Sequence, residues 1–275
     1  MVTTVSLLPT EGIPPSGYPA NGKLSWCCGD SEESFRRRGG HGYSETDIVY
    51  EFNRLGYRCP EFDSAADLRI LAIGCSYVFG LGLPREQVFH ELFAERLRVE
   101  TSRSVVLWNL GKPAASNDYI CRMAYLAVPY LDPHIVLVNF THLGRREYLS
   151  VQNKLFEYYA NWNYGGDPVA GEICGHFDAL SSPCDDALNF FRNYKALESL
   201  LAGRMWLFSR IHSEDLLPPL ADHLDGTRFA GTLNFLDRAR DGFHPGSDGH
   251  RQLYEAYWKR FIDLYGPAPG RFARP

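Results

Sequence analysis

The sequence predicts an α/β protein whose core is a three-layer α/β/α arrangement around a flavodoxin-like parallel sheet. From residue 67 onward, short apolar runs of strand length alternate with longer stretches of helical periodicity. This alternation implies right-handed crossovers and a parallel sheet that helices cover on both faces. The first run ends in Gly74 and is followed by a turn that contains Gly80 and Gly82, so Ser76 is expected at the carboxyl edge of the sheet, where open α/β folds bind ligands.

The expected elements follow from hydrophobic periodicity and from the turn residues that separate them. Continuous apolar runs predict buried strands over 70–74, 105–110, 135–140 and 205–208. Apolar residues at helical spacing predict helices over about 85–99, 117–130, 187–201 and 247–264. In the first of these helices one face carries Val88, Leu92, Phe93 and Leu97, which is the pattern of a helix packed on a sheet.

Three further segments complete the expected organisation. Residues 1–66 are an N-terminal extension: an irregular arm rich in Pro and Gly to about residue 23, then a stretch whose aromatic residues predict packing on the core, with a strand over 48–52. Residues 67–265 form the main domain, and residues 266–275 are a C-terminal tail.

An aromatic insertion at about 145–186 interrupts the alternating pattern after the strand 135–140. Because it leaves the carboxyl end of a core strand, it suits a lid or pocket wall, and a structural cap that never touches substrate is the competing interpretation. As a lid it would supply Arg145, Tyr159 and Trp162 to a substrate. Arg145 could bind a carboxylate or phosphate there, and ion pairing within the segment is the alternative.

The composition is that of an ordinary globular protein and excludes several classes. The 275 residues contain 28 basic and 33 acidic side chains, which gives a net charge of −5 and no electrostatic footprint for nucleic acid. The run Arg36-Arg37-Arg38 is interpreted as a solvated turn. The chain shows no signal-peptide pattern near its start and no apolar stretch long enough to span a bilayer, so we expect a cytoplasmic protein without membrane insertion.

Seven cysteines are expected to be reduced and mostly buried. The group Cys174-Gly175-His176 with Cys184 lacks the paired spacing of a metal knuckle, so no metal site and no cofactor are predicted. Cys75 is the thiol next to Ser76, and we expect it to face the core.

Two motifs carry the chemistry. Ser76 follows the first strong strand, and Asp241-Gly242-Phe243-His244-Pro245 precedes the last helix. An aspartate three residues before a histidine can hold one imidazole nitrogen while the other nitrogen takes the proton of a serine hydroxyl. Ser76, His244 and Asp241 are therefore a candidate nucleophile, base and orienting carboxylate.

These motifs resemble those of the SGNH hydrolase superfamily, also called GDSL-like hydrolases. Gly74-Cys75-Ser76 is similar to its Gly-Asp-Ser block, with Cys75 in place of Asp, and Asp241, His244 and Pro245 match its last block. The resemblance covers roughly residues 68–260. It implies the SGNH hydrolase fold, the roles just given for Ser76, His244 and Asp241, and an oxyanion hole.

The chain matches the second and third sequence blocks of the family less well than the first and the last. The second block resembles residues 109–117 and implies backbone N–H donors at Ser76 and at Ala114, with Gly111 the other candidate. In the third block the ungapped register puts Leu143 where the family has an asparagine. Asn139, Asn117 and His142 stay open as the substitute side-chain donor.

The family's literal tripeptide also occurs at Gly29-Asp30-Ser31, but no strand precedes it. Ser31 is instead predicted to cap a helix whose first turn carries Glu32 and Glu33.

The expected function is hydrolysis of an ester or thioester through an acyl-enzyme on Ser76, with a small acyl ester or thioester as the partner molecule. An acyltransferase that uses the same three residues and a non-catalytic binding protein on a hydrolase fold are the alternatives. The sequence leaves open the acyl group, the leaving group and the oligomeric state.

Overall fold

The computed structural model describes residues 3–4, 12–63, 65–149, 154–159, 168–211 and 218–266. Its centre is a five-stranded sheet in which the strands lie in the order β10-β9-β6-β4-β5 and every neighbouring pair is parallel. The strands are β4 (Leu68–Gly74), β5 (Val105–Asn109), β6 (Ile135–Phe140), β9 (Met205–Arg210) and β10 (Phe229–Thr232).

The strand order confirms the predicted flavodoxin-like sheet. Counted along the chain within this sheet, the second strand lies outside the first, and the third, fourth and fifth follow on the other side. Four of the five strands lie where the apolar runs predict them. The edge strand β10 was not predicted, because its short sequence Phe229-Ala230-Gly231-Thr232 has no strand-like apolar run.

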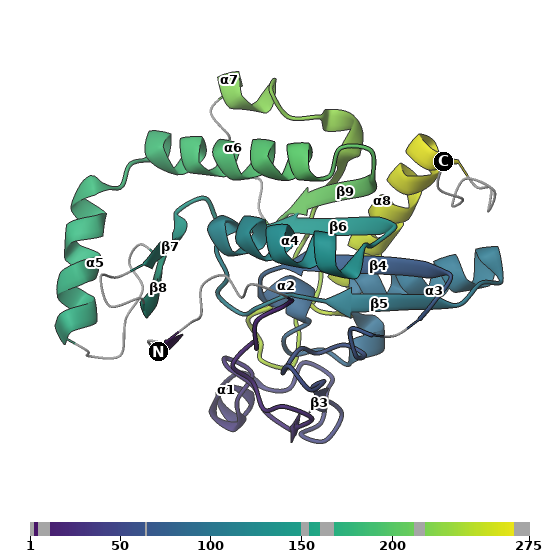
Figure 1. The fold of residues 1–275 in the computed structure, drawn as a ribbon. Helices are drawn as coiled ribbons and strands as arrows, with labels where there is room; N and C mark the ends of the chain where they lie inside the picture. Colours follow the sequence, from purple (N-terminus) through teal and green to yellow (C-terminus); the bar gives the residue numbers. More distant parts are fainter. Residues whose placement is uncertain are drawn as a thin grey trace.

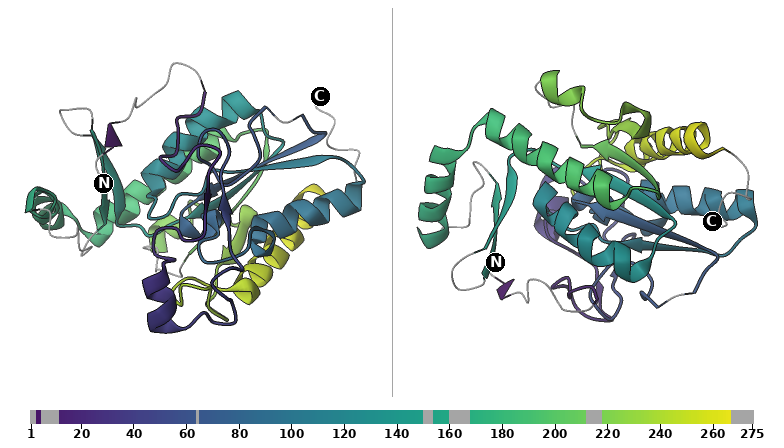
Figure 2. Two further views of the ribbon diagram at one scale, coloured as in Figure 1. Left: turned by 90° about the horizontal axis from the view of Figure 1, so that it is seen from below. Right: turned by 45° about the horizontal axis from the view of Figure 1, so that its top comes forward.

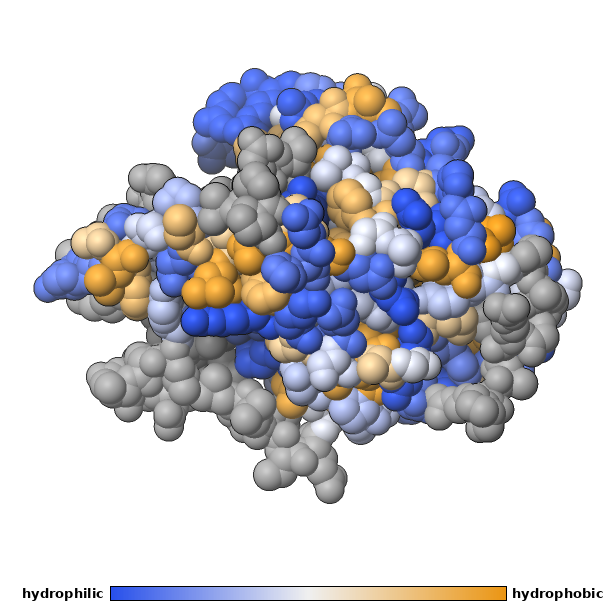
Figure 3. All heavy atoms as spheres, turned by 90° about the horizontal axis from the view of Figure 1, so that it is seen from above, coloured by the Kyte–Doolittle hydropathy of each residue, from blue (hydrophilic) through white to orange (hydrophobic). Residues whose placement is uncertain are grey.

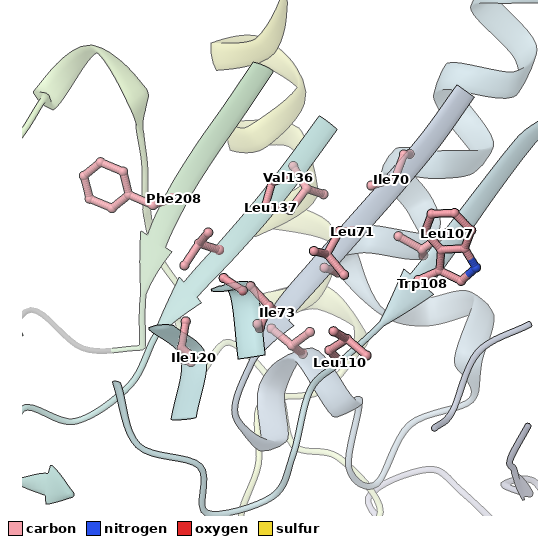
Figure 4. Close-up of a cluster of buried hydrophobic side chains, with 14 of the residues drawn as sticks. Ile70, Leu71, Ile73, Leu107, Trp108, Leu110, Ile120, Val136, Leu137 and Phe208 are labelled. Atoms are coloured by element: carbon pink, nitrogen blue, oxygen red, sulfur yellow. The ribbon is translucent and has the colours of Figure 1, made fainter. Parts of the chain in front are cut away.

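Helices cover both faces of the sheet (Figure 1). On one face α3 (Phe89–Thr101) packs against α8 (Ser247–Tyr265), and on the other α4 (Asn117–Leu131) packs against α6 (Pro183–Leu200). Figure 4 shows the core between them, where side chains of β4, β5 and β6 such as Ile70, Leu107 and Val136 lie close together. All three are buried, as a parallel sheet covered on both faces requires.

Residues 12–63, which we call the N-terminal segment, pack on the carboxyl side of this core. They contain the small pair β2 (Lys23–Leu24) and β3 (Tyr50–Glu51), where the sequence predicts a longer strand, and the helix α1 (Glu32–Arg38). Ser31 caps α1 by accepting from the Ser34 N–H, as predicted. A separate apolar cluster joins this segment to the turn after β4; its members are Cys27, Ile48, Tyr50, Phe52, Phe79 and Leu81.

The insertion forms its own small unit at the left of Figure 1, whereas α1 and β3 of the N-terminal segment lie at the bottom; both views of Figure 2 show the insertion projecting from one end of the molecule. An antiparallel hairpin joins β7 (Arg145–Leu149) and β8 (Lys154–Tyr159), and β1 (Thr3–Thr4) pairs with β8. The helix α5 (Pro168–Leu180) follows. Neither the hairpin nor α5 was predicted.

The remaining short elements are α2 (Ser76–Phe79), η1 (Arg85–Gln87), α7 (Pro218–Ala221) and η2 (Gly226–Arg228). On the face shown in Figure 3, hydrophobic residues lie in separate groups among hydrophilic ones. Within the described ranges, no helix has both the length and the apolar composition that crossing a bilayer requires.

Candidate active site

The turn after β4 presents Ser76. Strand β4 ends at Gly74, Cys75 precedes the short helix α2 with extended backbone angles, and Ser76 is the first residue of that helix. Gly80 ends α2 in the left-handed conformation (φ 75°). Ser76 is 7% exposed, so its hydroxyl lies at the floor of a recess rather than on the open surface.

The structure brings Ser76, His244 and Asp241 together. His244 Nε2 lies 2.9 Å from Ser76 Oγ, and His244 Nδ1 lies 2.5 Å from Asp241 Oδ2. With the carboxylate ionised, the ring proton belongs on Nδ1, and Nε2 is free to accept from the serine hydroxyl. This is the geometry of a nucleophile, a general base and an orienting group.

The loop before α8 holds Asp241 in place. Its Oδ1 accepts from the backbone N–H groups of Phe243 and His244, both at 2.9 Å, and only 1% of the residue is exposed. Burial alone would raise the pKa of Asp241, but the hydrogen bonds and charge of His244 and the two N–H donors hold it below its usual range. The carboxylate therefore stays ionised and keeps the imidazole oriented. The ring of Tyr77 contacts the edge of His244, with centroids 5.4 Å apart.

The backbone favours Ala114 over Gly111 as the second oxyanion donor. The Gly111 N–H donates to Asn109 Oδ1 at 2.8 Å, so it is occupied. A Cβ at position 111 would meet the backbone of Phe79 at 2.3 Å, which shows that glycine is needed there for close approach to α2. Ser76 and Ala114 both line the cavity, and neither N–H donates to a backbone acceptor in the described ranges.

Ala114 has a φ of 65°, which lies in the left-handed region that favours glycine. The neighbouring Lys112 N–H donates to Gly74 O at 3.1 Å, so this loop is tied to the strand end that carries the nucleophile. Holding a non-glycine residue in this conformation costs about 1 kcal/mol or more, so contacts of the surrounding loop must stabilise it. Such strained residues are concentrated at functional sites, which makes the Ala114 N–H a candidate oxyanion donor.

The two candidate asparagines are not available as oxyanion donors. Asn139 is fully buried in β6, and its Nδ2 donates to Ser209 Oγ at 2.7 Å. The Asn117 amide holds the end of β6: Oδ1 accepts from the Thr141 N–H at 3.0 Å, and Nδ2 donates to Thr141 O at 3.3 Å. Neither lines the cavity. Of the side-chain candidates, only His142 does.

A cavity of about 750 Å³ opens above Ser76. Its lining residues come from the carboxyl ends of core strands, from the loop 233–246 before α8 and from the N-terminal segment: Cys28, Gly29, Ser34, Arg38, Cys75, Ser76, Tyr77, Leu81, Pro113, Ala114, His142, Arg145, Ile211, Phe235, Arg238, Asp241, Phe243 and His244. The volume is that of a typical small-molecule site.

Sequence reasoning missed the contribution of the N-terminal segment. Arg38, interpreted as part of a solvated turn, ends α1 and lines the cavity, and its Nη1 donates to Asp241 O at 3.3 Å. Cys28 also lines the cavity. No sequence signal indicates this placement, because it depends on contacts across about two hundred residues of chain.

Cys28 and Cys75 are thiols of different kinds. Cys75 is fully buried in the core, as expected, although it also borders the cavity. Cys28 is exposed, with a φ of 53°. The Cys27 thiol donates to Cys28 Sγ and, with Tyr18 and Lys112, lowers the pKa of Cys28 to about 7 against the effect of partial burial.

Of the three substrate-binding residues predicted in the insertion, the structure places only the side chain of Arg145. Arg145 lines the cavity, and its Nη1 also donates to Thr141 Oγ1 at 2.9 Å. Tyr159 ends β8, but its side chain lies outside the described part of the structure, as does all of Trp162. All seven cysteines are free thiols, and no group of three or more potential metal-ligating side chains occurs among the described residues.

No protein-family model matches the chain, and no curated protein matches it. Among solved structures, the chain is similar to a lipolytic protein of the G-D-S-L family from Veillonella parvula, with 10% identity and a TM-score of 0.41 over 72% of this chain and 100% of that chain. It is similar to a lipase from a goat rumen metagenome, with 14% identity and a TM-score of 0.43 over 70% of this chain and 97% of that chain. It is also similar to an acetyl xylan esterase from the rumen bacterium Butyrivibrio proteoclasticus, with 10% identity and a TM-score of 0.46 over 74% of this chain and 66% of that chain. At these identities and TM-scores, the likeness carries no conclusion about the reaction or the substrate of this chain.

Proposed function

We propose that the protein is a serine hydrolase that cleaves an ester or thioester through an acyl-enzyme on Ser76. The observation that carries this proposal is the unbroken hydrogen-bond relay from Ser76 Oγ through His244 to Asp241 at the floor of a cavity. Each residue supplies one of the roles that a weak hydroxyl nucleophile needs, and the arrangement is assembled before substrate arrives.

In the first step His244 Nε2 takes the Ser76 proton as Oγ attacks the carbonyl carbon of the substrate. Asp241 stabilises the imidazolium that forms, since its carboxylate is buried, ionised and bonded to Nδ1. His244 then gives the proton to the departing alcohol or thiol. The acyl group remains on Ser76.

The negative charge on the carbonyl oxygen is stabilised by the N–H groups of Ser76 and Ala114 in this proposal. With Asn117 and Asn139 engaged elsewhere, the side-chain donor of the family is missing unless His142 replaces it. Loss of one such donor lowers turnover by about 10²–10³-fold in enzymes where it has been removed, so we expect slow turnover of simple esters.

In the second step water, activated by His244, attacks the acyl-enzyme and releases the acid. Another alcohol could take the place of water, and the chemistry up to the acyl-enzyme would be the same. Adding alcohol acceptors to the assay and measuring the ratio of transfer product to free acid separates acyltransferase from hydrolase.

The test is turnover of chromogenic esters and acyl thioesters of graded chain length. Ser76→Ala and His244→Ala should each abolish turnover while the protein stays folded, because the two residues act as one unit. Asp241→Asn should be severely impaired through loss of imidazole orientation. Ser104→Ala, whose hydroxyl donates to Asp67 near the amino end of β5, is the matched control. Comparable turnover in Ser76→Ala would contradict the proposal.

A further inference from the structure

The wall of the cavity carries an excess of positive charge. Among the described residues that line it, three are arginines, Arg38, Arg145 and Arg238, and the one carboxylate is that of Asp241. That carboxylate does not pair with any of the three arginines, because Oδ1 accepts from two backbone N–H groups and Oδ2 pairs with His244. The protein as a whole is negative, with a net charge of −5, so the charge on the cavity wall is opposite in sign to the net charge of the protein.

Arg38 and Arg238 each donate one hydrogen bond to a backbone carbonyl of the loop 233–246, to which Arg238 itself belongs. Nη1 of Arg38 donates to Asp241 O at 3.3 Å, and Nη1 of Arg238 donates to Phe243 O at 3.0 Å. Each guanidinium also lies over an aromatic ring, Arg38 at 5.6 Å from the centroid of Phe243 and Arg238 at 4.7 Å from that of Phe235.

Neither guanidinium has a carboxylate within 4.0 Å in the described ranges of the chain. A guanidinium has five N–H donors, so most donors of both side chains remain for another acceptor. Arg38, Arg238 and the two rings are all exposed, so an anion held there stays partly hydrated and the attraction is that of a charge pair near the protein surface. The geometry suits a carboxylate or phosphate, which arginine binds through its planar fork.

We propose that Arg38 and Arg238 bind an anionic group of the substrate, so that the protein acts on esters or thioesters that carry a carboxylate or phosphate. This proposal rests on the proposed function for the reaction, but the binding site itself does not depend on it. The anion can belong to the acyl group or to the leaving group, and the two cases are separable.

Two pairs of matched esters test the proposal. For the acyl side, 4-nitrophenyl hemiglutarate is compared with 4-nitrophenyl valerate, which has the same chain length without the charge. For the leaving-group side, the acetyl ester of 4-hydroxybenzoate is compared with that of methyl 4-hydroxybenzoate. The quantity measured is the ratio of kcat/KM between the charged and the neutral ester, after subtraction of the uncatalysed rate.

In at least one pair we expect the charged ester to be preferred, and we expect Arg38→Gln and Arg238→Gln each to lower the ratio by about tenfold. Using the ratio cancels any disturbance of Asp241 that the Arg38 substitution causes. Arg37→Gln removes a neighbouring exposed charge that does not line the cavity, and it should leave the ratio unchanged. High salt should lower the preference of the native protein.

A ratio of one or less in both pairs overturns the proposal, and so does a ratio that responds to Arg37→Gln as strongly as to the other two substitutions. Binding of glutarate and of inorganic phosphate to the Ser76→Ala protein, measured by calorimetry, keeps the site testable if no ester is turned over. Weaker binding in the Arg38→Gln/Arg238→Gln background supports the site. Equal or absent binding rejects it, whatever the reaction proves to be.

A second observation concerns Arg240, the residue before Asp241, whose side chain is fully buried by the N-terminal segment. Nη2 donates to Asp30 Oδ2 at 2.6 Å and to Ser25 O at 2.6 Å, and Nη1 donates to Glu45 O at 2.8 Å. The guanidinium lies 4.0 Å from the centroid of the Trp26 ring. Both partners of the Asp30–Arg240 ion pair have side chains with 0% exposure.

The same cluster reaches the turn after β4. Tyr50 donates to Asp30 Oδ2 at 2.5 Å and accepts from the Gly82 N–H at 2.8 Å, while the Arg240 N–H donates to Gly82 O at 2.9 Å. The cluster therefore joins the loop of Asp241 to the turn that follows Ser76. We infer that Arg240 is a positioning residue that keeps the Asp241–His244 pair in line with Ser76.

The test replaces the ion pair by apolar residues of similar size, Arg240→Met with Asp30→Leu. Such a replacement is often neutral for stability, whereas removing one partner alone leaves a buried charge. The matched control is Arg122→Met with Glu147→Leu, which removes a two-bonded pair between α4 and the insertion at 2.8 and 2.9 Å. The readouts are Tm, kcat, KM and the rate at which a fluorophosphonate labels Ser76.

For the Arg240 pair we expect kcat and the labelling rate to fall by about tenfold or more while KM changes little. Tm should fall as well, because the carbonyls of Ser25 and Glu45 lose their donor, so the rates are compared at a temperature where the variant is fully folded. The control pair should not change the labelling rate. A wild-type labelling rate in the folded Arg240 pair variant overturns the inference, and so does a fall in activity that only follows a fall in Tm. If the pair variant does not fold, Arg240→Lys, which keeps a cation against Asp30 but loses the fork, is judged by the same two outcomes.

Discussion

The N-terminal segment and the insertion both lie outside the five-stranded core and both are rich in aromatic residues, yet they relate to the candidate site in different ways. The N-terminal segment supplies Cys28, Gly29, Ser34 and Arg38 to the cavity wall. Of the described residues of the insertion, only Arg145 lines it.

Their contacts explain the difference. The N-terminal segment reaches the core through buried polar groups, the Asp30–Arg240 pair and Arg58, which donates to backbone carbonyls around α2. The described part of the insertion bonds to α6 through Arg146, whose partners Asp185 and Asp186 keep 55% and 18% of their side chains exposed, and to itself through the stacked rings of Tyr148 and Phe177. Position along the chain, directly after a core strand, is therefore a poorer guide to the site than buried pairing.

Among substitutions that test this difference between the two regions, Arg58→Met should have the largest effect on stability and turnover. Arg58 is buried, and its donors satisfy the carbonyls of Phe79, Gly80 and Leu83 at 2.7 to 3.1 Å. Losing these charge-assisted bonds should lower the free energy of unfolding by about 3 kcal/mol and reduce ester turnover, since α2 carries Ser76. Denaturant unfolding and an ester assay measure the two effects.

Arg146→Met is the matched change in the insertion, because its partners Asp185 and Asp186 are more exposed. We expect it to cost about 1 kcal/mol and to leave relative turnover unchanged. An equal loss of activity from both substitutions would remove the distinction between the two regions.

Removing the hydroxyl of a buried tyrosine should have a smaller effect on the free energy of unfolding, and one tyrosine from each region can be compared. Tyr50→Phe deletes the hydroxyl that donates to Asp30 and accepts from the Gly82 N–H, so it leaves a buried donor unsatisfied and should cost about 2 kcal/mol. Tyr158→Phe in the insertion deletes a hydroxyl that bonds to Asp178, an exposed residue, and should cost less than about 1 kcal/mol. A larger loss of Tm for Tyr158→Phe than for Tyr50→Phe would contradict the assignment of the buried network to the N-terminal segment.

The two exposed cysteines provide a pH-dependent comparison. The reactive thiolate of Cys28 forms as the pH rises through its lowered pKa of about 7, so alkylation by iodoacetamide should rise between pH 6 and pH 8 with a midpoint near 7. Because Cys28 lines the cavity, its modification should also lower ester turnover. Cys184, at the start of α6 and away from the cavity, is the control, and its modification should not. Inhibition that persists in Cys28→Ser would show that another thiol is responsible.

The smallest effect is expected for Trp162→Ala, which distinguishes a lid from a structural cap in the insertion. A lid would make Trp162→Ala change substrate preference more than thermal stability, as pocket walls do. Of the described residues of the insertion only Arg145 lines the cavity; if the wall is complete without Trp162, relative kcat/KM across acyl chain lengths should change by less than about threefold. A larger change with an unaltered Tm would establish the insertion as a lid.

The core of the fold could be predicted because buried parallel strands produce continuous apolar runs, as in β4 and β6. The edge strand β10 could not, since its four residues include Ala230 and Gly231 and it depends on pairing with β9. The hairpin of β7 and β8 was missed because aromatic residues there suggested a loop rather than an alternating pattern.

The candidate triad followed from the sequence because each motif is local: Ser76 directly follows a strand, and Asp241 precedes His244 by three residues. The cavity wall did not, because Arg38 and Asp241, which both line it, meet across 203 residues of chain. The choice between Ala114 and Gly111 needed the backbone, since only the structure shows that the Gly111 N–H is occupied.

The role of Ser76 as the nucleophile is tested most directly by trapping it with a fluorophosphonate, followed by intact-protein and peptide mass spectrometry. If Ser76 and His244 act as nucleophile and base, one adduct forms, on Ser76, at a rate that depends on His244, and none forms in Ser76→Ala. An adduct on Cys28 or Cys75 with Ser76 unmodified, or labelling of Ser76 that is equally fast in His244→Ala, would contradict the claim that Ser76 and His244 form a working nucleophile and base.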